Sequence, residues 1–383
     1  MSGSRASVAI AGAVGAVVCV VLLGGAAPAQ AQGCVASRMN APTPPADALE
    51  AKDADGNSYY LPKGHWQASF GYRDYRSHRH FVGSAEQDGS PGTTDRRNNE
   101  VVNNIHLPEF AIAYGFNDRT SLTLDVPVGF LHRRNPQRAA TATSPAIPYV
   151  YTDGNGLGDI TLTGRYWVGQ PTRGDQNLSF GLGIKLPTGQ DDVSGTYLRA
   201  VNGTLQSWVH PVDQSIQPGD GGTGIIAEVQ AFKVMGPVVG FASGSYLFNP
   251  RGVNGVQTGR GDPNEAVMSV ADQFAARAGV TLPIRALKGL SVSVDARLEG
   301  VPAYDLIGSS AGFRRPGYSI GIEPGIAYSW QKTSLSFSVP YLVRRVRSQS
   351  YADHLATDAS GVFRNGDAAF ADYLIIGGFS KRF

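Results

Sequence analysis

The chain has 383 residues, of which 17% are charged, and its formal net charge at pH 7 is +2. This charged fraction lies below the roughly 25% typical of soluble domains, and the near-neutral balance gives no electrostatic reason to expect a nucleic-acid partner. Glycine contributes 48 residues and cysteine only two, Cys19 and Cys34. Removal of a leader that contains Cys19 would exclude a disulfide framework.

The N-terminus predicts a targeting segment. Arg5 precedes an apolar run over residues 8–27, and an Ala-Gln-Ala motif that fits a cleavage site follows. We therefore predict a signal peptide over residues 1–31. An uncleaved membrane anchor and lipidation of Cys34 stay open as alternatives, although Ala31 stands where a lipoprotein signal needs a larger apolar residue. No later run reaches 18 apolar residues, so no transmembrane helix is expected.

Residues 32–64 predict a flexible periplasmic segment, because Pro, Ala and Asp dominate and little apolar surface is available to bury. The stretch "DADGN" has an acidic pattern that also occurs in calcium loops, but it lacks their distal glutamate. A turn is the simpler interpretation. The barrel described next is predicted over residues 65–383.

From His65 onward, segments of about ten residues alternate apolar with polar or small side chains, which is the period of a β-strand. In chain order these segments are "QASFGYRDY", "EFAIAYGF", "SLTLDVPVGF", "ITLTGRYWV", "LSFGLGIKL", "IIAEVQAFKV", "VVGFASGSYLF", "QFAARAGVTL", "LSVSVDARL", "YSIGIEPGIAYSW", "LSFSVPYLVRR" and "DYLIIGGFSKRF". The pattern predicts an all-β fold of about twelve antiparallel strands.

The connections between these segments alternate between short turns and long polar loops. The long loops cover about residues 77–104, 133–156, 189–223, 249–271, 301–316 and 348–369. Bacterial outer-membrane barrels have short periplasmic turns and long extracellular loops. We therefore predict a closed transmembrane β-barrel in the bacterial outer membrane, in which the last strand pairs with the first and leaves no sheet edge in lipid.

The charged residues of the predicted strands gather on one face, whereas the other face is apolar. A membrane barrel places its polar face in the lumen, and a soluble barrel does the reverse. On the predicted outer face only Lys233 and Arg345 carry charge, both near strand ends. The predicted lumen-facing charges are Arg73, Glu109, Asp125, Arg165, Lys185, Glu228, Arg277, Asp295, Arg297, Glu299, Glu323, Arg344 and Asp372. Their near balance of sign predicts an internal network of ion pairs.

The C-terminal strand ends the chain on an aromatic residue. Tyr373, Phe379 and Phe383 follow the pattern of the C-terminal signal that outer-membrane proteins present to the barrel-assembly machinery. We therefore expect that machinery and the outer-membrane lipids as partners.

Candidate catalytic and metal-binding patterns are weak. No Gly-x-Ser-x-Gly nucleophile motif lies on a strand-to-helix turn, and no Ser can be paired convincingly with a His. His78 and His80 could hold a metal in principle, but no third His or Cys stands nearby and a solvated loop is the simpler interpretation. The stretches "GNGLGD" and "GDGGTG" predict turns before strands, because no helix follows to complete a phosphate site. The sequence predicts no cofactor, no metal and no enzymatic activity.

Several stretches resemble one family of outer-membrane barrels. "LPKGHWQASFGYRDYRSHRHFVG", "YGFNDRTSLTLDVPVGF", "GLGDITLTGRYWV", "GLGIKLPTGQDD" and "FASGSYLFNPRG" are similar to the meta-pathway of phenol degradation family, over about residues 61–383. The most telling parts are Gly-Leu-Gly-Asp at 156–159 and Leu-Pro-Thr-Gly at 186–189. The resemblance implies transport of aromatic or other hydrophobic compounds and brings no catalytic residues.

The leading functional prediction is a passive channel for small molecules, with aromatic or hydrophobic compounds as candidate solutes. The lumen-facing charges would line or gate its path. Two alternatives stay open: a structural or adhesive barrel that is closed and acts through its loops, and a barrel enzyme that hydrolyses lipids. Nucleic acid is not an expected partner.

Overall fold

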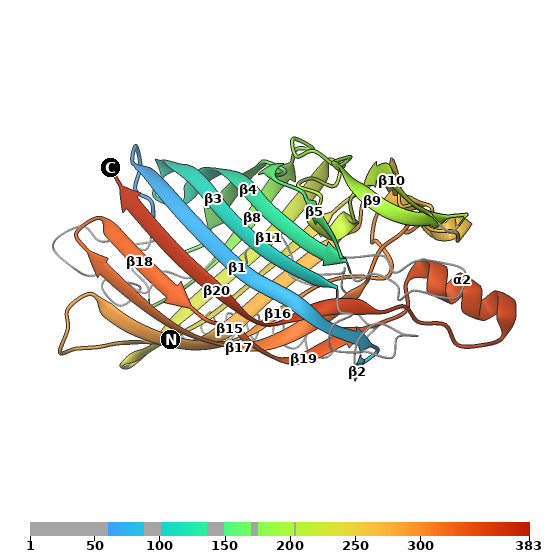
Figure 1. Cartoon of the computed structure of the whole chain (residues 1–383). Coiled ribbons are helices and arrows are strands. Elements are labelled where there is room, and N and C mark those ends of the chain that lie inside the picture. Colours follow the sequence, from blue (N-terminus) through green and yellow to red (C-terminus); the bar gives the residue numbers. More distant parts are fainter. Residues whose placement is uncertain (1–59, 88–100, 136–148, 170–174, 203) are drawn as a thin grey trace.

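The computed structural model describes residues 60–87, 101–135, 149–169, 175–202 and 204–383. These residues form a β-barrel (Figure 1). Its wall strands are β1 (Trp66–Val82), β3 (Val102–Asn117), β4 (Thr120–Asn135), β7 (Thr161–Trp167), β8 (Gln176–Lys185), β11 (Gly224–Met235), β12 (Val238–Phe248), β15 (Gln273–Pro283), β16 (Leu290–Val301), β17 (Gly317–Trp330), β18 (Thr333–Ser338) with β19 (Tyr341–Arg347), and β20 (Ala368–Arg382).

The wall contains twelve strands when β18 and β19 are counted as two parts of one strand. Each strand pairs antiparallel with its neighbours in the chain, and the short strands β5 (Val150–Asp153) and β6 (Gly156–Leu157) extend the pairing of β4. The last strand closes the wall on the first, from Gln67 opposite Arg382 to Phe81 opposite Ala368. The prediction of a closed antiparallel barrel of about twelve strands is confirmed.

The outer face of the barrel is apolar, as contact with lipid requires. Phe110 in β3, Leu182 in β8 and Ile322 in β17 are exposed on this face. Their immediate neighbours along the chain, among them Glu109 and Glu323, face the lumen instead. The alternation that is read from the sequence therefore separates a lipid-facing surface from a polar interior.

The two ends of the barrel differ in the length of their connections, as predicted. Two-residue turns join β3 to β4, β11 to β12 and β17 to β18. Gly236 and Gln331 adopt positive φ angles of 63° and 50° in two of these turns. A tight reversal between strands needs this left-handed backbone, which glycine adopts without steric cost.

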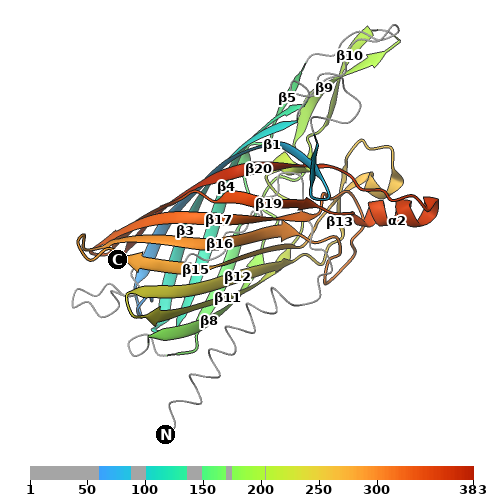
Figure 2. The same ribbon diagram turned by 90° about the horizontal axis from the view of Figure 1, so that it is seen from below.

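The opposite, extracellular end carries the long loops and their own small elements (Figures 1 and 2). These elements are β2 (Ala85–Gln87), the hairpin of β9 (Ser194–Val201) and β10 (Thr204–Pro211), η2 (Gln214–Ile216), β13 (Val253–Gln257), η3 (Pro263–Glu265), β14 (Val267–Ser269) and α2 (Tyr351–Ser360). The β9–β10 hairpin projects away from the barrel in Figure 2. Within the described ranges, no helix has the length and apolarity needed to cross a membrane.

One predicted lumen residue lies elsewhere because of a local irregularity in the wall. Arg344 is exposed, whereas Arg345, which we expected near the outer face, is buried and binds Asp372 at 2.8 Å. The pairing of β17 with β19 shifts register next to Gly321, so two successive residues of β19 face outward. Such a bulge reverses the inside-outside alternation beyond it. The assignment of Arg344 to the lumen was therefore wrong.

The start of the barrel also differs from the predicted boundary. Tyr60 is only 3% exposed, and the backbone of residues 64 and 65 hydrogen-bonds to Gly115 of β3. The last residues of the segment predicted as flexible are thus part of the packed barrel. The predicted signal peptide over 1–31, most of the 32–64 segment, Cys34 and the "DADGN" stretch lie outside the described residues.

Candidate functional site: the barrel lumen

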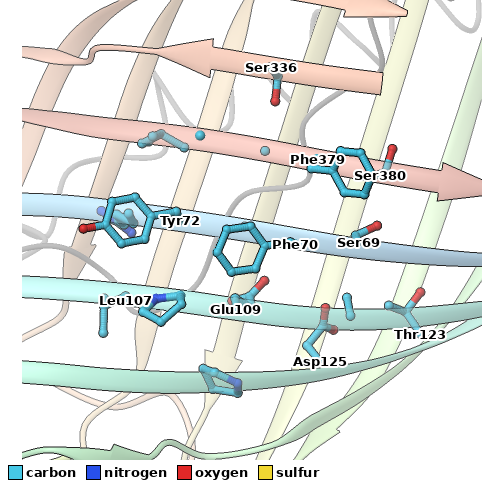
Figure 3. Close-up of a pocket in the computed structure, with 18 of the residues that line it drawn as sticks. Ser69, Phe70, Tyr72, Leu107, Glu109, Thr123, Asp125, Ser336, Phe379 and Ser380 are labelled. Atoms are coloured by element: carbon cyan, nitrogen blue, oxygen red, sulfur yellow. The ribbon is translucent and has the colours of Figure 1, made fainter. Parts of the chain in front are cut away.

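A cavity of about 600 Å³ occupies the lumen. Leu131 and Pro218 line it toward the loops, and Leu61 and Trp167 line it toward the short turns. Between these limits, charged and hydroxyl side chains line it together with apolar ones. Figure 3 shows Glu109 and Asp125 on neighbouring strands, together with hydroxyl side chains that include Ser336.

One cluster of charges lies on the wall formed by β4, β7 and β11. The Arg165 guanidinium lies 2.5 Å from a Glu228 carboxylate oxygen and donates to Gln230 at 3.0 Å. The Thr161 hydroxyl donates to Asp125 at 3.3 Å. The side chains of Arg165 and Glu228 keep 18% and 12% of their exposure, so both contact the cavity. This cluster can therefore interact with a solute or ion inside the lumen.

A second cluster, which we call the dry cluster, lies on the opposite wall. Its charged side chains are much less exposed than those of the first cluster. Arg277 binds Asp295 and Glu323, both at 2.9 Å, and Arg297 binds Glu323 at 3.2 Å. The Ser338 hydroxyl donates to the same Glu323 at 2.6 Å. The four charged side chains are at most 6% exposed. Buried charges of this kind need partners, and this network gives each of the four side chains at least one ion pair.

The dry cluster extends across the lumen through Glu299 of β16. Glu299 accepts from Arg297 at 3.2 Å and from Arg73 of β1 at 2.7 Å. Strands β17, β19 and β20 stand between β16 and β1 in the wall. The Arg73–Glu299 pair therefore connects strands that are not neighbours, and it narrows the lumen between them.

Two sequence motifs meet beside the cavity. Asp159, the last residue of "GLGD", accepts from the backbone N–H of Gly189, the last residue of "LPTG", at 3.0 Å. It also accepts from the backbone N–H of Asp220 at 3.2 Å. Lys185 of β8 binds Asp220 and lies 3.6 Å from Asp159. The motifs therefore fix the base of the loop that connects β8 to β11.

The loop that connects β8 to β11 folds back into the barrel. Its apolar side chains cover the extracellular side of the cavity. We call residues Val212–Gln217 the plug segment. Val212 and Ile216 are fully buried. They pack in one cluster with Tyr75, Ile105, Leu131, Leu342, Ala371 and Leu374, which come from β1, β3, β4, β19 and β20. The extracellular part of the lumen is therefore filled and apolar, in contrast to the charged cavity below it.

An apolar cluster also lies near the other end of the barrel. Tyr60 packs against Trp167 with ring centroids 5.0 Å apart, and Phe232, Val239 and Phe241 complete the cluster. The Tyr60 hydroxyl accepts from the Asn177 amide at 2.7 Å. The chain that precedes β1 is thereby anchored to the inner wall.

The structure distributes the predicted site residues over these features. Nine of them line the cavity: Arg73, Glu109, Asp125, Arg165, Lys185, Glu228, Arg277, Arg297 and Glu323. Asp295 and Glu299 are buried in the dry cluster, and Asp372 binds Arg79 and Arg345. Tyr373, Phe379 and Phe383 are exposed, and Phe379 is also among the residues that line the cavity (Figure 3).

Sequence analysis missed the plug segment and the carboxylates Asp159 and Asp220. The Gly-Leu-Gly-Asp motif was a signal for Asp159, because an acid at a fixed place after glycines indicates a backbone-binding role. No group of three or more His, Cys, Asp or Glu residues suited to a metal ion occurs in the part of the chain that the structure describes.

Comparison with solved structures identifies the fold. An outer membrane channel from Pseudomonas putida F1 matches with a TM-score of 0.50 and 13% identity, over 84% of this chain and 97% of the channel. The CymD monoaromatic hydrocarbon channel matches with a TM-score of 0.46 and 10% identity, over 92% and 98%. The toluene transporter TbuX of Ralstonia pickettii matches with a TM-score of 0.44 and 10% identity, over 92% and 97%.

No known family profile and no curated protein sequence matches the chain. The closed wall, the apolar outer belt and the likeness to the Pseudomonas putida channel define the class. The chain is a transmembrane β-barrel with the fold of bacterial outer-membrane channels.

Proposed function

We propose that this barrel is a passive channel that carries small hydrophobic molecules, including aromatic compounds, across the outer membrane. The observation that carries the proposal is the lumen itself, a cavity of about 600 Å³ beneath an apolar roof. Apolar constrictions lose water and thereby oppose ions more than apolar solutes. The cavity volume also falls within the ~300–1,000 Å³ of typical small-molecule sites.

The same proposal includes three features of the sequence: a family resemblance, a C-terminal aromatic pattern and a leader. The resemblance to the phenol meta-pathway family favours aromatic compounds. Tyr373, Phe379 and Phe383 would be presented to the barrel-assembly machinery during insertion, and the leader over residues 1–31 would direct export. The proposal assigns no catalytic step to any residue.

Uptake of N-phenyl-1-naphthylamine into intact cells tests the proposal. This aromatic probe is held back by an intact outer leaflet and fluoresces on reaching an apolar environment. Cells that produce the barrel should take it up several-fold faster than cells with an empty vector. A hydrophilic sugar serves as the control for general leakage and should enter both at the same rate. Equal probe uptake by both cell types would contradict the proposal.

The second candidate is a surface barrel that acts through its loops. It is favoured by the filled extracellular part of the lumen and by the projecting β9–β10 hairpin (Figure 2). Tyr197, Trp208 and His210 gather on that hairpin, with ring centroids of Trp208 and His210 4.7 Å apart. Absence of probe uptake by a correctly folded barrel would shift the assignment to this candidate.

A further inference from the structure

We propose that the plug segment, Val212–Gln217, is a latched apolar gate that determines which solutes pass the lumen. In this assignment Val212 and Ile216 exclude ions and water, and Asp213 holds them in place. The inference rests on the proposed channel function and adds the residues that would set its specificity. A loop, and not the charges of the barrel wall, would then determine which solutes pass.

The plug segment lies inside the barrel without being part of its wall. Residues 214–216 form a single 3-10 turn, and Asp213 caps it by accepting from the Ser215 backbone N–H at 3.0 Å. No wall strand pairs with the segment in the sheets of the described residues. It is held by packing, by side-chain hydrogen bonds and by a backbone hydrogen bond from the Val212 N–H to the Val193 carbonyl, so it can move without breaking the strand ladder.

The latch is a set of ion pairs that draws on two walls of the barrel. Arg315, just before β17, donates to both carboxylate oxygens of Asp213 at 2.8 and 2.7 Å. Arg133 of β4 lies 3.4 Å from the same carboxylate and donates to the Ser215 hydroxyl at 3.2 Å. Strands β3, β1, β20 and β19 separate β4 from β17. Asp213 thus ties the plug segment to nearly opposite sides of the mouth.

A glycine makes room for the seated segment. A Cβ atom on Gly154 would come within 1.6 Å of the Ile216 carbonyl oxygen. Real Cβ atoms essentially never approach backbone oxygen so closely, so alanine at this position would force the segment and the chain around Gly154 apart. Gly154 also donates its backbone N–H to the Leu131 carbonyl at 2.8 Å, which places it on the wall beside the apolar cluster.

The plug segment and the cavity share a boundary. Leu131 belongs to the apolar cluster and also lines the cavity, and Pro218 follows the segment directly and lines the cavity too. Lifting the segment would therefore connect the cavity with the extracellular mouth. The glycines at 219, 221 and 222 follow it, and Gly221 has a positive φ of 77°, a backbone conformation that glycine adopts without steric cost.

Ion conductance of the full mature protein in a planar bilayer tests the gate. Wild type should conduct rarely, whereas Asp213→Asn and Gly154→Ala should each raise the open probability at least tenfold. Asp262→Asn is the matched control, because Asp262 caps the 3-10 turn η3 in the same way, accepting from Asn264 N–H at 2.8 Å, but outside the apolar cluster. The control should behave as wild type does.

A thiol probe tests movement of the segment without relying on conductance. Ile216→Cys is made together with Cys34→Ser, so that it is the reactive cysteine of the mature chain. A charged methanethiosulfonate reagent should modify it slowly, and at least tenfold faster when Asp213→Asn is added. If neither conductance nor modification changes in variants that still show heat-modifiable folded barrels, the segment is a fixed part of the barrel and the inference fails.

The two proposals fail in different ways. If wild-type cells take up no aromatic probe but the Asp213 and Gly154 variants still conduct, the gate stands and the proposed solute is wrong. If wild-type cells take up the probe and the variants conduct as wild type does, the channel stands and the gate is wrong.

Discussion

The two charge clusters of the lumen contain the same residue types but differ in their surroundings. The β15–β17 cluster is at most 6% exposed and each of its carboxylates has more than one donor or an arginine fork. The Arg165–Glu228 pair is 12–18% exposed and borders open space. The difference teaches that charges lining the same cavity can be buried to very different degrees. We therefore expect the β15–β17 cluster to hold the wall in shape and the Arg165–Glu228 pair to be accessible to solutes.

The largest effect is expected from Glu323→Ala in the dry cluster. The substitution leaves Arg277 and Arg297 buried with one partner fewer each. Removing one partner of a buried ion pair costs about 3–5 kcal/mol of unfolding free energy. Urea unfolding of the refolded protein, followed by its heat-modifiable gel shift, measures this loss.

Glu86→Ala is the matched control for that substitution. Glu86 also binds an arginine, Arg79, but their side chains are 39% and 31% exposed, so the expected loss is below about 1 kcal/mol. Equal losses for Glu323→Ala and Glu86→Ala would contradict a structural role for the buried β15–β17 cluster.

A smaller effect on stability but a change in ion preference is expected from the second cluster. Arg165→Ala should lower the unfolding free energy by about 1–2 kcal/mol, because charged hydrogen bonds to Glu228 and Gln230 are lost. In the Gly154→Ala background, Arg165→Ala should shift the ion selectivity of the lumen toward cations. In the same background, Glu228→Gln should shift that selectivity toward anions. Reversal potentials in a salt gradient measure both shifts. Identical reversal potentials in Gly154→Ala and in the two double variants would show that ions do not pass the Arg165–Glu228 pair.

The N-terminal anchor should contribute less. Tyr60→Phe removes the hydroxyl that accepts from Asn177 and should cost about 1 kcal/mol of unfolding free energy. Tyr151→Phe, at a side chain that is 70% exposed, provides the comparison and should change that free energy by less than about 0.5 kcal/mol. Urea unfolding again gives both values, and equal values would mean that the Tyr60 hydrogen bond adds nothing.

The smallest effect is expected from pH. Burial by itself raises the pKa of Asp213, but Arg133 and Arg315 together hold that pKa well below its usual value. A carboxyl with a lowered folded pKa gives stability that is present above the unfolded value of about 3.9 and is lost as pH falls through the folded pKa. The open probability of the wild-type barrel in a planar bilayer should therefore be the same at about pH 8 and about pH 5, both above that unfolded value. A higher open probability at the lower pH would mean that another group controls the segment.

The wall of this barrel follows from local patterns, and so the sequence predicts it well. Phe110 faces lipid and Glu109 faces the lumen because successive residues of a strand alternate. The same rule failed at Arg344 and Arg345, where one bulge shifts the alternation and nothing in "YLVRRVR" marks its position. Which charges are dry and which are accessible also depends on strands far apart in the chain, as the Arg73–Glu299 pair illustrates.

The plug segment could not be predicted for a different reason. Val212 and Ile216 stand in "HPVDQSIQPG", a stretch with the composition of a surface loop. Their burial depends on a cavity that exists only when the barrel has closed around it. The motifs near the segment were visible, but their contact with each other was not, because "GLGD" and "LPTG" meet only through the pairing of β7 with β8.

The pairing of β20 with β1 has a consequence for how the protein is made. Phe70 of β1 lies opposite Phe379 of β20, so the second edge of the first wall strand is covered only after β20 has been synthesised. Long-range pairing of this kind is slow. Loss of the last few residues would therefore reduce the yield of inserted barrels, while the barrels that do close would keep the same lumen.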